Sequence, residues 1–149
     1  MVTIRPVTKN DAACWLRLRC ALWPNGSQSE HRGEIEHFFS GQADEPQAVF
    51  LALDASGHAV GLAELSVRPC AEGCRTDRVA YLEGWYVVPE ARRRGIGRAL
   101  VEAAEEWGRA QGCTEFASDT EPDNKVSGLA HHALGFKDVG MVRCFRKDL

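Results

Sequence analysis

Hydrophobic residues recur along the chain at two spacings, one typical of helices and one typical of strands. Residues 2–6 predict a short strand, followed by an amphipathic helix that ends at Pro24, because proline cannot continue it. Residues 29–40 predict a second helix. We expect the phenylalanines of this second helix to face the core, and its polar residues, including His31, to face solvent.

The middle of the chain has the shorter period of β-strands. Residues 48–54 and 59–68 predict two strands joined by a hairpin, and therefore antiparallel. The polar loop over residues 69–78 is long enough to lie over a site rather than merely turn the chain. A further strand, rich in aromatic and β-branched residues, begins at Tyr81 and ends at Pro89.

The helical period returns at Ile96 and continues to about Gly112. Residues 113–118 predict another strand, and residues 123–134 a helix with Val126, Leu129 and Ala133 in phase on one face. Residues 139–145 predict a last strand before a charged tail.

The order of these elements, β-α-α-β-β-β-α-β-α-β, predicts an α+β fold. We expect one domain over residues 1–149, with a mixed, mostly antiparallel central sheet flanked by helices. One right-handed β-α-β crossover should join the strand that begins at Tyr81 to the strand that follows it.

Composition limits the partners. The 149 residues are 44% hydrophobic and carry a net charge of −3, so the global basic field of most nucleic-acid binders is missing. There is no signal-like N-terminus and no apolar run long enough for a membrane span, which favours a cytoplasmic protein that binds neither membrane nor nucleic acid.

Six cysteines are scattered through the chain, and only Cys70 and Cys74 are close together. This is not a zinc-binding spacing, and a chain of this size has a core without disulfides. We therefore expect reduced cysteines and no metal.

A turn rich in glycine and arginine joins the strand ending at Pro89 to the helix beginning at Ile96. Gly95 and Gly97 allow backbone N–H groups to approach a ligand, and the helix start adds unpaired donors and a positive dipole end. Full charges come from Arg92, Arg93, Arg94 and Arg98. The arrangement predicts a phosphate or pyrophosphate ligand. A solvated turn without a ligand is the alternative.

The segment Arg92-x-x-Gly95-x-Gly97, after a strand ending in V-V-P, resembles the acetyl-CoA pyrophosphate loop of the GCN5-related N-acetyltransferases (GNAT). Asn124 and the A-L-G-F segment from Ala133 match a second block of that family, and the element order agrees over the whole chain. The resemblance implies a GNAT fold and an acetyl-CoA co-substrate. It places the cofactor on Trp85, Tyr86, Val87, Arg93, Arg94, Gly95, Ile96, Gly97, Arg98 and Asn124.

Further segments resemble the chromosomal-type aminoglycoside 6'-N-acetyltransferases: L-W-P, Y-L-E-G, A-S-D-T and H-x-A-L-G-F. This narrower resemblance implies direct transfer of acetyl to the 6'-amine of an aminoglycoside in a ternary complex, with antibiotic resistance as the result. It also implies a homodimer, since similar enzymes often complete the cleft with a second subunit. The substrate is then a small cationic amine.

Glu83 interrupts an apolar aromatic strand, where an unpaired carboxylate would be costly, so it needs a partner. The resemblance implies that Glu83 contacts the amine and acts, directly or through water, as the base. An internal ion pair with an arginine such as Arg68 is the alternative. The resemblance implies that Asp119 orients the amine and can share the base function. The alternative is a residue that merely caps a turn.

Trp23 is implied to form a wall of the substrate cleft, where an aromatic face suits a sugar or an ammonium; without the resemblance a core role is as plausible. His131 stands where many relatives carry a tyrosine proposed to protonate the departing thiolate, and a surface histidine is the alternative. Cys70, Gly26 and Gly140 stand where similar enzymes can have a substrate-contacting tyrosine, a histidine and an acid. These departures leave the preferred drug open.

Two other functions remain open from the sequence. One is a GNAT enzyme that acetylates another small amine, a polyamine or a peptide N-terminus. The other is a catalytically silent acyl-CoA sensor, which fits poorly with acids at both Glu83 and Asp119.

Overall fold

The computed structural model describes all residues from Met1 to Leu149. The elements in chain order are β1 (Thr3–Pro6), a 3₁₀ turn (Lys9–Asp11), α1 (Ala12–Leu22), α2 (Gln28–Phe39), β2 (Ala48–Leu53), β3 (Ala59–Arg68), β4 (Val79–Val87), a 3₁₀ turn (Pro89–Ala91), α3 (Ile96–Ala110), β5 (Glu115–Ser118) and α4 (Lys125–Ala133). None of the helices is long and apolar enough to cross a membrane.

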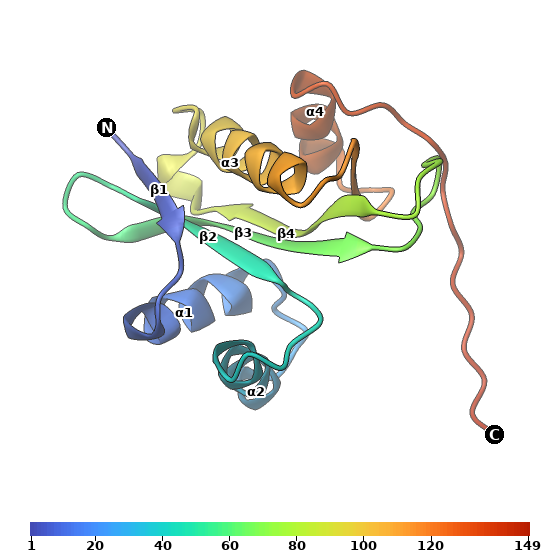
Figure 1. The fold of residues 1–149 in the computed structure, drawn as a ribbon. Coiled ribbons are helices and arrows are strands. Elements are labelled where there is room, and N and C mark those ends of the chain that lie inside the picture. Colours follow the sequence, from blue (N-terminus) through green and yellow to red (C-terminus); the bar gives the residue numbers. More distant parts are fainter.

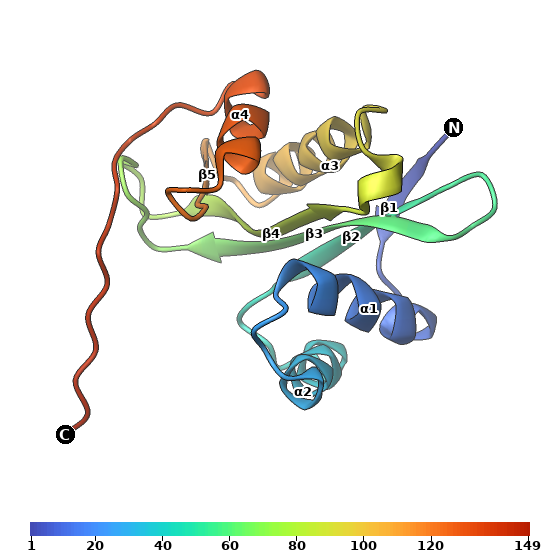
Figure 2. The same cartoon turned by 180° about the vertical axis from the view of Figure 1, so that it is seen from behind.

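A five-stranded sheet in the order β1-β2-β3-β4-β5 forms the centre of the molecule. The first three pairings are antiparallel, and β4 pairs with β5 in parallel, as the strand-turn-helix-strand order predicts. Helices α3 and α4 cover one face and α1 and α2 the other (Figures 1 and 2). The predicted α+β fold class is therefore confirmed.

Each face of the sheet is sealed by the apolar stripe of one helix. On one side α3 buries Leu100 and Ala104 completely, and on the other side α1 buries Trp15 and Leu18 completely. Trp15 also meets Phe38 edge to face, with 5.1 Å between ring centroids, so the predicted inward face of α2 is confirmed. This packing fixes the two helix layers on which the site is built.

One expectation for the helices was wrong. His31 faces inward and is only 5% exposed, because its Nε2 lies 3.1 Å from the carbonyl oxygen of Trp23 and its ring stacks beside that indole. On α4 the apolar residues that are in phase are open to solvent, with Val126 72% and Leu129 70% exposed.

The predicted last strand over residues 139–145 is also absent. After α4 the chain continues without regular structure and leaves the body of the molecule (Figure 1). A strand needs a hydrogen-bonded neighbour, and none lies beside this segment in a single chain. Its apolar side chains are consequently exposed, Val139 by 59% and Phe145 by 87%.

Candidate active site

A gap opens beside the second half of β4, where the edge strand β5 ends. The parallel ladder runs from Val79–Glu115 to Leu82–Ser118 and stops there, whereas β4 continues to Val87. Residues 84–87 of β4 therefore pair with β3 on one side and have no strand on the other. Such an edge offers main-chain hydrogen bonds to a ligand lying in the gap.

The glycine turn stands at the end of β4. Gly95 is the N-cap of α3 with φ of 80°, and no side chain caps this helix. Arg93 also has a positive φ, 63°, a conformation that an arginine rarely adopts and that typically occurs in ligand clamps. The exposed helix start, with its unpaired N–H groups, suits an anion.

Gly97 allows α3 to pack closely on β4. A Cβ on Gly97 would lie 3.1 Å from Cζ2 of Trp85, and Nε1 of Trp85 donates a hydrogen bond of 3.2 Å to the Gly97 carbonyl. The nearby arginines differ in their use. Arg92 donates to the carbonyl of Val87 at 2.8 Å, whereas the side chains of Arg93 and Arg94 are exposed to solvent.

Glu83 lies in a β-bulge that the sequence did not reveal. Leu65 of β3 pairs with Leu82, and the preceding Glu64 pairs with Gly84, so Glu83 is an extra residue without a partner on β3. Bulges of this kind redirect a side chain and are frequent beside active sites. The Glu83 side chain is 9% exposed.

The Glu83 carboxylate is held by Arg68. Nε of Arg68 lies 2.7 Å from Oε1 and Nη2 lies 2.5 Å from Oε2, a bidentate pair, so the ion pair considered from the sequence does exist. Burial raises the pKa of Glu83, the hydrogen bonds from Arg68 lower it, and the nearby Glu45 raises it further. The net effect is a raised pKa of Glu83, so Arg68 offsets only part of the cost of burying this charge.

Asp119 is joined to the same group of residues through Tyr81. The Tyr81 hydroxyl donates a 2.5 Å hydrogen bond to Oδ2 of Asp119, and Cζ of Arg68 lies 3.6 Å from the centroid of the Tyr81 ring. Burial, together with this hydrogen bond, raises the pKa of the Tyr81 hydroxyl, which therefore remains a donor. Both predicted acids are thus within one side chain of Arg68.

A cavity of about 520 Å³ opens beside Glu83 on the side of α1 and α2. Its lining is Arg19, Trp23, Gly26, Glu30, His31, Glu34, Glu45, Pro46, Glu64 and Glu83. Trp23 forms a wall against the strand, since a Cβ on Gly84 would lie 2.8 Å from its Cη2. The volume suits a small organic ligand, and the excess of glutamates suits a cationic one.

The floor of this cavity is a buried ion pair that the sequence analysis missed. Arg19 is 4% and Glu64 1% exposed, and Nε and Nη2 of Arg19 lie 2.7 and 3.0 Å from the Glu64 oxygens. Nε1 of Trp15 donates to the same carboxylate at 2.9 Å. The signal was a glutamate inside the apolar run of β3, where only a paired charge is tolerated.

His131 lies at the gap between β4 and β5. Its Nδ1 is 2.7 Å from the carbonyl oxygen of Ser127, so Nδ1 carries the proton, and the Ser118 hydroxyl is 2.8 Å from Nε2. The ring is also edge-on to Trp85, 5.2 Å between centroids. The histidine is therefore oriented within the structure and is not a freely moving surface residue.

Three other predicted residues lie outside the acidic cavity. Asn124 is the N-cap of α4, where its Oδ1 accepts a 3.1 Å hydrogen bond from the backbone N–H of Ser127. Cys70 is exposed in the loop between β3 and β4, and Gly140 lies in the C-terminal tail with φ of 149°. Their proposed contacts with ligands stay predictions.

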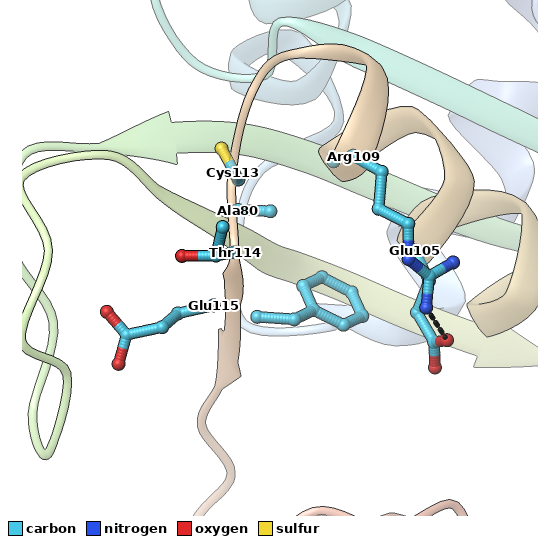
Figure 3. Close-up of a pocket in the computed structure, with 8 residues that line it drawn as sticks. Ala80, Glu105, Arg109, Cys113, Thr114 and Glu115 are labelled. Atoms are coloured by element: carbon cyan, nitrogen blue, oxygen red, sulfur yellow. Dashed lines mark hydrogen bonds and ion pairs between the residues drawn. The ribbon is translucent and has the colours of Figure 1, made fainter.

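A second, smaller cavity of about 160 Å³ lies between the end of α3 and β5 (Figure 3). Ala80, Cys113 and Phe116 contribute to its lining, and the exposed pair Arg109–Glu105 stands at its helix side, Nη2 to Oε2 3.4 Å. None of the predicted site residues lines it, so the larger acidic cavity is the candidate active site.

Comparison with known proteins identifies the class to which this fold and site belong. The model of the acetyltransferase (GNAT) family matches residues 12–136. The chain belongs to this family, as its glycine turn and element order predict.

Two relatives carry the name of a particular enzyme of this family. The chain is 57% identical over 146 residues to aminoglycoside N(6')-acetyltransferase type 1 from Klebsiella aerogenes, covering 98% of this chain and 96% of the relative. It is 40% identical to the enzyme of the same name from Stenotrophomonas maltophilia, covering 99% and 94%.

Solved structures of aminoglycoside acetyltransferases have a fold similar to that of this chain. Aminoglycoside N-acetyltransferase AAC(6')-Iy in complex with CoA has a TM-score of 0.92 at 38% identity and covers 100% of this chain and 96% of that one. The same enzyme with the bisubstrate analogue CoA-S-monomethyl-acetylneamine also has a TM-score of 0.92 at 38% identity, covering 100% and 99%. AAC(6')-Ih from Acinetobacter baumannii follows at a TM-score of 0.90 and 37% identity, covering 100% and 99%.

Proposed function

We infer that this chain is an acetyl-CoA-dependent aminoglycoside 6'-N-acetyltransferase that confers resistance by transferring acetyl directly to the 6'-amine. The observation that carries this inference is one strand, β4, with an anion-binding glycine turn at its end and Glu83 in an acidic cavity at its bulge. The high identity to enzymes of that name over almost the whole chain supports it.

Acetyl-CoA, when bound, supplies the activated thioester. The residues that would hold it are the backbone of Arg93 to Arg98 around the pyrophosphate and the free edge of β4 from Trp85 to Val87 along the pantetheine arm. Asn124 at the start of α4 completes this group. The fit rests on the uncapped helix start and on the strand edge that β5 leaves uncovered.

Glu83 and Asp119 prepare the amine. The substrate nitrogen arrives as an ammonium, and Glu83 accepts its proton, directly or through water, so that the neutral amine can attack the thioester carbon. Asp119, hydrogen-bonded to Tyr81, orients the amine. A main-chain N–H near Val87 stabilises the carbonyl oxygen as charge develops on it.

His131 is the general acid in this proposal. When the carbon–sulfur bond breaks, the thiolate needs a proton, and His131 lies beside Trp85 with both ring nitrogens in hydrogen bonds. Because Nδ1 donates to the Ser127 carbonyl, the proton comes from Nε2 of the doubly protonated imidazole. The Ser118 hydroxyl, 2.8 Å from Nε2, gives its own proton to the thiolate and takes this one, which leaves neutral His131 protonated at Nδ1.

Trp23 and Gly26 line the cavity in which the antibiotic rings lie. Cys70 and Gly140, which lie outside the cavity lining, are predicted to contact the substrate at the outer rim.

We also propose a homodimer. Apart from Met1, every large hydrophobic residue that is strongly exposed belongs to α4 or the tail: Val126, Leu129, Val139, Met141, Val142, Phe145 and Leu149. Apolar surface gathered in this way is expected to be covered by another subunit. Six free cysteines suit a cytoplasmic location.

The function is tested by CoA release on neomycin and paromomycin, which differ only by an amine or a hydroxyl at the 6' position. We expect turnover on neomycin and at least a hundredfold less on paromomycin. Equal turnover on both would place the reaction on another nitrogen. Turnover on polyamines or peptides alone would establish a different substrate, and CoA binding without any turnover would establish the silent sensor.

A further inference from the structure

Arg68 occupies the position that a substrate ammonium would need. Its guanidinium makes two hydrogen bonds to Glu83, of 2.7 and 2.5 Å, and these use both carboxylate oxygens. Each oxygen has a second lone pair, but an ammonium that used it would lie beside the guanidinium, so that two cations would compete for one carboxylate. The substrate must therefore displace Arg68 or share Glu83 with it.

A second carboxylate is within reach of the arginine. Oε1 of Glu45 lies 3.8 Å from Nη2 of Arg68, and the Glu45 side chain is 59% exposed where that of Glu83 is 9% exposed. Glu45 lies between α2 and β2, outside the sheet. A small movement of the Arg68 side chain would give it a new partner in a more solvated position.

The ring of Tyr81 provides a platform for this movement. Cζ of Arg68 is 3.6 Å from the ring centroid, and the guanidinium keeps this cation–π contact while its hydrogen bonds change. The hydroxyl of the same ring holds Asp119. Arg68 therefore connects the two acids that prepare the amine.

We propose that Arg68 is a positioning residue that holds the Glu83 carboxylate in the free enzyme and transfers to Glu45 when the cationic substrate takes its place. This proposal rests on the proposed function, because it needs an ammonium as substrate. It assigns Glu45 as the residue that receives Arg68, a role that neither the glycine turn nor the bulge implies.

Other charged and titratable groups surround Glu83. The cavity around Glu83 is lined by Arg19 of α1, by Glu64 of β3, and by three residues of α2, which are Glu30, His31 and Glu34. Tyr81 and Asp119 lie on the side of β4 and β5. Arg19 is already engaged by Glu64 and Glu34. Arg68 is thus the cation that makes direct hydrogen bonds to Glu83.

The two partners of Arg68 should respond in opposite ways. In Arg68→Met, the competitor for Glu83 is lost, so the KM for the aminoglycoside falls severalfold, while kcat falls about tenfold because Glu83 is no longer held. In Glu45→Gln, Arg68 lacks its second partner and stays on Glu83, so KM rises severalfold with kcat nearly unchanged. Arg68→Lys, which keeps the charge but not the fork, should lie between wild type and Arg68→Met.

The pH dependence of kcat/KM is an independent test of the contact between Arg68 and Glu83. Removal of the guanidinium removes the hydrogen bonds that lower the pKa of the buried Glu83, so the acidic limb of the kcat/KM profile moves to higher pH in Arg68→Met. Arg109→Met, which removes an exposed arginine from α3, is the matched control and should leave the limb in place.

The test that does not depend on substrate identity is a ¹³C NMR titration of the Glu83 carboxyl in the full-length protein without substrate, assigned with Glu83→Gln. We expect a higher titration midpoint in Arg68→Met than in wild type and in Arg109→Met. Equal midpoints would overturn the proposal even if aminoglycosides are acetylated. A shifted midpoint in a protein that does not acetylate aminoglycosides would contradict the proposed function and leave the Arg68–Glu83 coupling established. A KM that rises in Arg68→Met would overturn the displacement step.

Discussion

Trp23 lies directly against Gly84, so closely that a Cβ on the glycine would be 2.8 Å from Cη2 of the indole. The glycine next to Glu83 therefore makes room for the wall of the cavity. Gly84→Ala should push Trp23 into that cavity and lower kcat/KM for the aminoglycoside about tenfold, with CoA affinity unchanged. Steady-state kinetics and CoA titration would measure both effects.

The control for this substitution is Gly33→Ala. Gly33 lies in α2 with no heavy atom within 4 Å of the added methyl group, so the change should leave activity unaltered and raise helix stability slightly. A Gly84→Ala variant with wild-type kinetics would show that Trp23 does not border the bound substrate.

The glycine turn is expected to bind the CoA pyrophosphate through its backbone. Gly95→Ala forces a Cβ onto a residue with φ of 80°, which costs about 1 kcal/mol and crowds the helix start, so the Kd for CoA should rise at least tenfold. Calorimetric titration with CoA would measure it.

Gly57→Ala provides a matched comparison. Gly57 has φ of 82° in the turn between β2 and β3, so it should show a similar loss in thermal stability with unchanged CoA affinity. Equal CoA affinity in the two variants would remove the turn from the cofactor site.

The buried pair Arg19–Glu64 should matter mainly for stability. Arg19→Met leaves a carboxylate that is 1% exposed without its main partner, which is expected to cost about 3–5 kcal/mol. The double variant Arg19→Met/Glu64→Leu should lose clearly less than the sum of the two single variants in urea unfolding. Additive losses would show that the two side chains contribute independently.

Asp11 provides a pH-dependent contribution to stability. Hydrogen bonds from Arg5, at 2.7 and 2.9 Å, hold the pKa of Asp11 well below its ordinary value. A lowered pKa means that the ionised form is favoured in the folded state, so this stabilisation is present above about pH 4 and is lost as the pH falls below it.

Asp11→Asn should consequently lower stability at neutral pH by about 1 kcal/mol and flatten the loss between about pH 4 and pH 2. Urea unfolding across this range would show it. Asp44→Asn, at an exposed position, should keep the slope of the wild type. An unchanged slope in Asp11→Asn would contradict the assigned ion pair.

The local features of this protein were predictable from its sequence, whereas features that depend on distant neighbours were not. The glycine turn and the strand before it follow from residues close together in the chain, and both occur as expected. The bulge at Glu83 depends on the register between β3 and β4, which the composition of β4 alone does not determine.

The burial of individual polar residues was not predicted from the sequence. His31 reads as a solvent-facing residue of an amphipathic helix, but the carbonyl of Trp23 draws it inward. Glu64 of β3 is paired with Arg19 of α1, which is 45 residues away in the sequence. The segment 139–145 has the period of a strand but lacks a neighbouring strand in the single chain, so its hydrogen bonds are not made.

Glu83 and Asp119 should both be needed for turnover. Glu83→Gln removes the proposed proton acceptor and should lower kcat at least a hundredfold, while Asp119→Asn should lower kcat/KM by about tenfold, because its role is orientation. Circular dichroism should show that both variants fold. A Glu83→Gln enzyme with wild-type kcat would exclude Glu83 as the base.

The position of the new acetyl group on the antibiotic is the sharpest test of the proposed 6'-N-acetyltransferase activity. Neomycin is incubated with the full-length protein and acetyl-CoA carrying ¹³C in the acetyl group, and the product is read by NMR. We expect a single acetyl group, attached to the 6' nitrogen. An acetyl group on any other nitrogen, or no acetylated product from an enzyme that binds CoA, would contradict it.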